Sequence, residues 1–212
     1  MKAITILFTL IVFLIGDVNL VNQTHQSIDT DIKAYDFAKE VLKENFRSDT
    51  FQLQFNDRRP KLFNQFSEEN LDKIVAFSDK NYPKNSLPQY YDHFTLVVFT
   101  YLNSKAAERS FDELVENSRY GIRDLQNLDE QQAKKAKAMA IYAKYGGLIV
   151  QQENLVLALI ETCRSTPIGG TWINYEEMFL RYISTSRTEL KVLNADCGMD
   201  KFILEYRKTK SR

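Results

Sequence analysis

The stretch Tyr145–Cys163 (YGGLIVQQENLVLALIETC) constrains the fold of this chain more than any other part of the sequence. It predicts two strands, over residues 147–152 and 155–163, joined by a short polar link. Apolar runs this short, flanked by glycines, favour strands over helices. The second run is apolar without a break from Leu155 to Ile160, so neither of its faces is suited to water. We therefore expect residues 155–163 to form a central strand of a sheet.

The composition is that of an ordinary globular protein. The chain has 212 residues, of which 44% are hydrophobic and 26% are charged, enough for one substantial domain with or without an extension. Lys and Arg together number 28, as do Asp and Glu, so the formal net charge is zero. Proteins that bind duplex DNA or RNA normally carry a net basic footprint. We therefore expect no nucleic-acid partner.

The N-terminus predicts export. Residues 3–16 form an apolar run after Met1 and Lys2, shorter than the ~20 residues that a membrane-spanning helix needs. Such a run is typical of a signal-peptide core, so we assign residues 1–21 to a signal peptide and residues 22–30 to a flexible tether. The expected location is the periplasm, the secreted space or the cell envelope. The cleavage signal is weak, and the alternative is an uncleaved N-terminal anchor that holds the chain at a membrane.

The region over residues 31–86 predicts a helix-strand-helix extension. Helical spacing of apolar residues indicates a helix over residues 31–46, and strict alternation indicates a strand over residues 51–55. Ser67 precedes two glutamates and an apolar stripe, which favours a second helix over residues 67–78. A loop with two prolines follows, so we expect this extension to pack against a separate domain over residues 87–212.

The order of elements in the second domain predicts an α+β fold. We expect a strand over residues 94–102, a helix capped by Asn103 or Ser104, a helix over residues 129–144, the two strands described above, a helix from Asn174, and a strand over residues 201–206. This β-α-(α)-β-β-α-β order, with one inserted helix, matches the ferredoxin-like antiparallel sheet.

That arrangement has consequences for how the sheet is covered. We expect its first and third strands to be central and to run parallel, with the helices on one face only. The doubly apolar third strand then needs a cover on its other face. The N-terminal extension is the favoured cover, because it has apolar faces of its own to bury. The alternative is another subunit, which allows a homodimer through the sheet.

The two cysteines, Cys163 and Cys197, follow the third strand and precede the last one. In the expected topology both lie at the same end of the sheet, and in an exported protein such a pair predicts a structural disulfide. Closing this loop would contribute roughly 3–4 kcal/mol. Inert thiols and a catalytic thiol are the alternatives, although the chain has no C-x-x-C motif.

Familiar catalytic patterns are poorly supported. His25 falls in the tether, which leaves His93 as the histidine of the domain, and the expected topology separates it from Cys163. No metal-ligand spacing or phosphate-binding loop occurs. The sequence therefore predicts no catalytic residue, no metal and no cofactor.

Aromatic residues in and beside loops form a candidate binding surface, because rigid amphipathic rings often make contacts. They are, with the neighbouring histidine, Tyr90, Tyr91, His93, Trp172 and Tyr175. We expect a non-enzymatic binding or structural module that meets a protein or small-molecule ligand outside the cytoplasm. The alternative is a hydrolase or thiol-dependent enzyme whose site is assembled only in three dimensions.

Overall fold

The structure, a computed structural model, describes residues 31–51, 65–79, 94–119, 127–161, 175–184, 189–195 and 202–208. The predicted signal peptide and tether lie outside these residues. Among the described residues, no helix is both long and apolar enough to cross a membrane.

Seven strands of the described residues form one antiparallel sheet, so the predicted mixture of helices with an antiparallel sheet is confirmed. The strands are β1 (Phe46–Phe51), β2 (Leu71–Asp79), β3 (Thr95–Tyr101), β4 (Gly147–Gln152), β5 (Leu155–Ile160), β6 (Glu189–Ala195) and β7 (Phe202–Lys208). Their order in the sheet is β1-β2-β3-β5-β4-β6-β7. The strand predicted from residue 155 is β5, which lies at the centre and is buried along its whole length.

Asn103 and Asp129 precede two of the helices, as their capping side chains predict. Residues 31–42 are helical, and α2 (Ser104–Ser118), α3 (Glu130–Tyr145) and α4 (Tyr175–Ile183) follow along the chain. The Asn103 side chain accepts a hydrogen bond from the Ala106 amide at 2.9 Å, which satisfies one of the free N–H groups at the start of α2. Asp129 caps α3 through the same contact with the Gln132 amide, at 2.8 Å.

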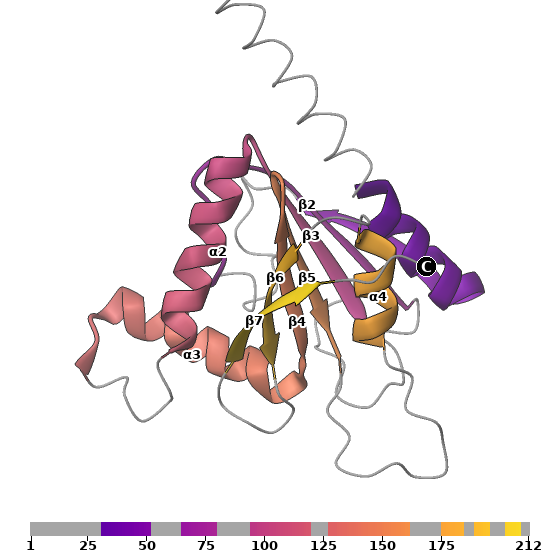
Figure 1. The fold of residues 1–212 in the computed structure, drawn as a ribbon. Helices are drawn as coiled ribbons and strands as arrows, with labels where there is room; N and C mark the ends of the chain where they lie inside the picture. The colour runs from indigo at the N-terminus through magenta and orange to yellow at the C-terminus, as the bar shows by residue number, and fades with distance from the viewer. Residues whose placement is uncertain are drawn as a thin grey trace, which may run out of the picture.

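Helices cover both faces of the sheet (Figure 1). On one face, here called the α2 face, Phe111 of α2 and Met139 of α3 are buried in a cluster with Val97, Phe99 and Ile149 of the strands. The opposite, α4 face is covered by α4 and by the helix of residues 31–42. The central strands are therefore apolar on both sides because both sides are enclosed.

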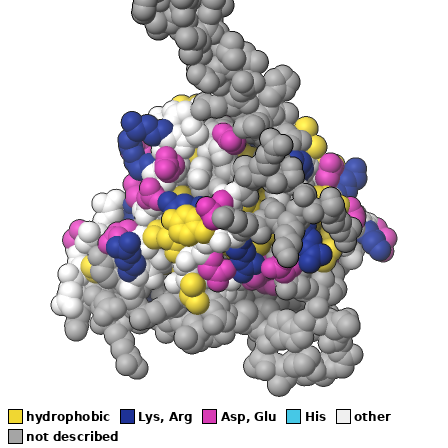
Figure 2. Space-filling view, viewed as in Figure 1, with side chains coloured by type: hydrophobic (Ala, Val, Ile, Leu, Met, Phe, Trp, Pro, Cys, Tyr) yellow, Lys and Arg dark blue, Asp and Glu magenta, His cyan; other side chains and the backbone are white. Residues whose placement is uncertain are grey.

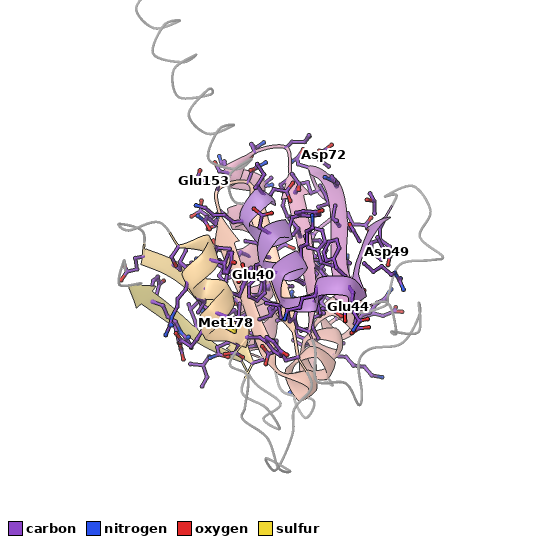
Figure 3. The ribbon with its side chains drawn as sticks, turned by 90° about the vertical axis from the view of Figure 1, so that its right-hand side faces the viewer. Glu40, Glu44, Asp49, Asp72, Glu153 and Met178 are labelled. Atoms are coloured by element: carbon purple, nitrogen blue, oxygen red, sulfur yellow. The ribbon has the colours of Figure 1, made fainter. Side chains whose placement is uncertain are left out.

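Aromatic rings join the two helices of the α4 face to the sheet. The Phe37 ring lies 5.1 Å from Phe94 and 5.2 Å from Phe179 of α4, measured between centroids. Figure 3 shows the two helices side by side, with Glu40 and Met178 on their outer surfaces. The Tyr182 hydroxyl donates a hydrogen bond to the Glu40 carboxylate, which links the helices at their solvent side.

The topology differs from the ferredoxin-like order in three ways. In that fold the predicted last strand, which is β7, would pair with β3, but β2 occupies this position and β7 pairs with β6 at the other edge of the sheet. The helices α2 and α4 cover opposite faces rather than one. The strands β3 and β5 run antiparallel, so the expectation that they are parallel is wrong.

Two segments have secondary structure that the sequence pattern did not indicate. The helix predicted over residues 67–78 is strand β2, and β6 was not predicted at all. In β2, Ile74 and Ala76 face the α2 cluster while Val75 and Phe77 face the α4 cluster. A strand buried on both faces shows no alternation, and its apolar spacing resembled that of a helix.

The first predicted helix is also shorter than expected. It ends at residue 42, and a short 3-10 turn over Lys43–Asn45 leads into β1. The predicted strand over residues 51–55 falls outside the described residues except for Phe51, the last residue of β1.

Candidate functional site

The register of the sheet brings several strand ends to one place. Ile160, the last residue of β5, pairs with Thr95 at the start of β3 and with Gly147 at the start of β4. Gly147 in turn pairs with Ala195, the last residue of β6. We call this the Ile160 end of the sheet.

The strand termini at the Ile160 end are close in sequence to three of the predicted site residues. His93 precedes Thr95 by two residues, Cys163 follows Ile160 by three, and Cys197 follows Ala195 by two. All three lie outside the described residues, as do Tyr90, Tyr91 and Trp172. The expected topology placed the start of the first strand and the end of the third at opposite ends of the sheet, and this is wrong because Thr95 and Ile160 are paired.

The strand ends that lead to the two cysteines also share this end of the sheet. Ile160 and Ala195 both pair with Gly147, so one strand, β4, lies between β5 and β6. The disulfide between Cys163 and Cys197 stays a prediction.

Tyr175 is the member of the candidate binding surface that the structure describes. Only 6% of it is exposed, and its ring packs edge-on against Phe94, with centroids 5.2 Å apart. Tyr175 begins α4 and Phe94 precedes β3, so this contact places the start of α4 at the Ile160 end. The ring acts here as part of the core.

Among the described residues at this end, Glu161 stands out, and it follows β5 directly. Its amide donates a hydrogen bond to the Gly146 carbonyl oxygen at 3.2 Å. Its carboxyl Oε1 is fully enclosed and has no hydrogen-bond partner among the described residues. Burial, and secondarily the negative charge of Glu176, raise the pKa of Glu161 to about 8. Near neutral pH this group is largely protonated, and it can gain or lose a proton within a physiological range.

Sequence reasoning did not single out Glu161. The available signal was its position, because a carboxyl placed directly after a strand that is buried on both faces begins inside the core and must be compensated or neutralised. Perturbed carboxyls are common at functional sites, so Glu161 is a candidate functional group. Among the described residues, no group of three potential ligands could hold a metal ion.

A second candidate lies at the edge of the sheet. Strand β7 pairs with β6 on one side, and no other described strand pairs with its outer side. Its exposed apolar residues are Ile203 at 52%, Leu204 at 37% and Tyr206 at 62%. Figure 2 shows apolar side chains near the middle of the view, where Figure 1 draws β7, with charged side chains around them.

The opposite edge of the sheet has a different character. Strand β1 exposes Ser48 and Thr50, whereas its two phenylalanines, Phe46 and Phe51, are partly buried against the core clusters. Sheet edges in natural proteins are usually protected by polar or charged side chains, as β1 is. Strand β7 also carries the charged Glu205 and Arg207, but unlike β1 it exposes three large apolar side chains, which makes its edge a candidate contact surface.

Comparison of the chain with protein-family models, with curated protein sequences and with solved structures found no match, so the candidate sites rest on the geometry described above.

Proposed function

We propose that this chain is an exported, non-enzymatic binding module that associates with a protein partner along the outer edge of β7. The observation that carries this proposal is the exposure of Ile203, Leu204 and Tyr206 on a strand without a described neighbour on its outer side. Both faces of the sheet are covered by helices, so an edge is where this sheet can accept another polypeptide.

The chemistry of an edge strand suits this role. Its unpaired N–H and C=O groups offer main-chain hydrogen bonds to an extended segment, and its alternating side chains add selectivity. On β7 the exposed apolar residues lie on both faces, since Leu204 and Ile203 are consecutive. An added strand would therefore bury apolar surface on both sides while it satisfies the main chain.

Site-specific photocrosslinking tests the proposal. A photoreactive amino acid replaces Tyr206 in the full chain, and a matched control replaces Thr50, which is exposed on the β1 edge. We expect a covalent adduct with a polypeptide, either another protein or a second copy, from position 206 and not from position 50. Adducts from neither position, or equal adducts from both, would reject β7 as the surface of association.

A thiol-dependent or hydrolytic enzyme is the second candidate. It is favoured by the position of Glu161, whose enclosed carboxyl lies at the same sheet end as the strand termini that lead to His93 and Cys163. In such an enzyme, Glu161 would hold or donate a proton beside a nucleophile.

Intact mass combined with thiol labelling, before and after reduction, separates the two candidates. A mature mass without the N-terminal run, together with thiols that label only after reduction, would support export and a Cys163–Cys197 disulfide, and would remove the thiol enzyme. A full-length mass with two freely labelled thiols would contradict the binding-module proposal in its exported form. Labelling of Cys163 that depends on Glu161 would then support the enzyme.

A further inference from the structure

We infer that the partner of β7 is a second copy of this chain, paired antiparallel across a two-fold axis centred on Tyr206. This inference rests on the proposed function, which assigns β7 as the surface of association. It adds the identity of the partner and the register of the pairing. The two sheets would then continue into each other through β7.

The side chains of β7 divide cleanly between the two faces. Phe202 packs against the α2-face cluster, and Leu204 and Tyr206 follow it at intervals of two. Arg207 points to the other face, because its guanidinium donates to Glu177 of α4 at 3.0 Å. Even-numbered residues of β7 therefore belong to the α2 face, and odd-numbered residues belong to the α4 face.

This division limits the register of a symmetric pair. A two-fold axis perpendicular to the sheet keeps each face of one copy continuous with the same face of the other. Residues that lie opposite each other must then share a face. The register is therefore centred on one residue of β7, which lies opposite its own copy across the axis, and not on a peptide bond between two residues. The candidates near the middle of β7 are Leu204, Glu205 and Tyr206.

Charge selects among these three registers. A pair centred on Glu205 would place this carboxylate opposite its own copy, and like charges directly opposite are destabilising. A pair centred on Leu204 would place Glu205 opposite Ile203. A pair centred on Tyr206 places Glu205 opposite Arg207 of the second copy, and it does so twice because of the symmetry. Charge complementarity therefore favours Tyr206 on the axis.

Contacts within one copy already hold the Arg207 side chain where pairing centred on Tyr206 needs it. Within one copy, the Arg207 guanidinium already donates to Glu205 at 2.8 Å and to Glu177, so its side chain is held on the α4 face. In the paired form the same guanidinium would lie between carboxylates of both copies. On the α2 face the Tyr206 rings, each 62% exposed, would meet at the axis and shield each other from water.

Charge reversal in solution tests both the partner and the register. The full chain is examined by sedimentation velocity over a range of concentrations, since a single strand pair buries less than the ~1,600 Å² of a standard interface and should associate weakly. Glu205→Arg and Arg207→Glu each place like charges opposite each other. We expect either change to weaken self-association by about tenfold or more.

Mixing the two variants provides the decisive result. In the mixture, one copy carries two arginines and the other carries two glutamates at positions 205 and 207, so both cross-strand pairs become complementary. We expect association to return on mixing. Arg47→Glu on the β1 edge is the matched control and should leave self-association unchanged, while thermal unfolding of each variant shows that the fold is retained.

Disulfide trapping checks the register independently of charge. In Tyr206→Cys the two engineered residues would lie opposite each other, with Cα atoms about 4.5–5.5 Å apart, within the range of a disulfide. In Ile203→Cys the equivalent atoms would lie roughly 20 Å apart along the strands. We expect an intermolecular bond at position 206 and none at position 203, with peptide mapping to distinguish both from bonds of the natural cysteines.

Three results would overturn the inference: a chain that stays monomeric at every concentration, variants that fail to associate on mixing, or trapping at position 203 in place of 206. A monomeric chain whose position 206 still photocrosslinks to another protein would reject the second copy but retain the proposed function. A chain that shows neither self-association nor photocrosslinking would reject both.

Discussion

Replacing Glu161 with glutamine should remove a pH-dependent loss of stability from this protein. Glutamine has the shape of the protonated carboxylic acid but cannot ionise. In the native protein the enclosed Oε1 has no hydrogen-bond partner within the described part of the chain, and burial together with the charge of Glu176 raises the pKa of Glu161 to about 8. The ordinary value is 4.5, so the folded and unfolded chains bind this proton differently over several pH units.

The sign and size of the effect follow from this difference. Between pH 4.5 and about 8, the folded protein holds a proton that the unfolded chain has released. The free energy of unfolding therefore falls as the pH rises, by at most ~1.4 kcal/mol per unit, and this contribution is fully present only below the unfolded-state pKa. The loss accumulated at pH 7 would be ~3 kcal/mol for a fully enclosed group. Because Glu161 retains some exposure to solvent, we expect about 1–3 kcal/mol.

Urea unfolding at a series of pH values measures the effect. We expect Glu161→Gln and the native chain to differ little near pH 5, and the variant to become the more stable of the two by about 1–3 kcal/mol near pH 8. Glu108→Gln, on the exposed surface of α2, is the matched control for the removal of one negative surface charge. Stability curves of Glu161→Gln and the native chain that stay parallel from pH 5 to pH 8 would refute the reasoning.

Two further predictions concern local structure. Gly147 has a φ of +114°, and a β-carbon there would lie 2.0 Å from the Leu159 carbonyl oxygen. Gly147→Ala should therefore destabilise the protein by ~3 kcal/mol or more, or prevent folding, as measured by urea unfolding. Normal stability of that variant would mean that β4 approaches β5 less closely than described. Asn103→Ala removes the cap of α2 and should lower the free energy of unfolding by ~1 kcal/mol. Asn103→Ser keeps a capping oxygen and should recover most of this stability. Equal losses of stability in both variants would show that the cap contributes little.

Much of the local structure could be predicted from the sequence because its causes are local. Asn103 and Asp129 predicted the starts of α2 and α3, because a short polar side chain can accept hydrogen bonds from the free amides of a first turn. The glycines and the short apolar runs around residues 147–160 indicated the β4–β5 hairpin. These signals depend on neighbours within a few residues, so they survive without knowledge of the fold.

Segments buried on both faces were harder to assign. Strand β2 is apolar without a break from Ile74 to Phe77, so it lacks the alternation of a half-exposed strand, and its apolar spacing resembled that of a helix. Its β-branched pair was the available clue, yet the acidic residues before it resembled a helix start. Only the presence of helices on both sides of the sheet decides that a strand of this kind is stable.

The properties of the candidate sites also depend on contacts between segments that are distant in the chain. Tyr175 was predicted to contribute to a surface from its residue type, but contact with Phe94 buries it in the structure. Glu161 gained its raised pKa from the enclosure around it and from Glu176 on another element. Neither property can be read from adjacent residues, because desolvation depends on which distant elements come together.

The sequence by itself therefore determined the class of the protein, the beginnings of its capped helices and the apolar character of its central strand. The tertiary structure alone decided the order of the strands, the antiparallel pairing of β3 with β5, the separation of α2 and α4 onto opposite faces and the exposed edge of β7. The physical reason is that capping and hydrophobic pattern act over a few residues. The choice of pairing partners is made by the burial of faces between segments that are distant in the chain.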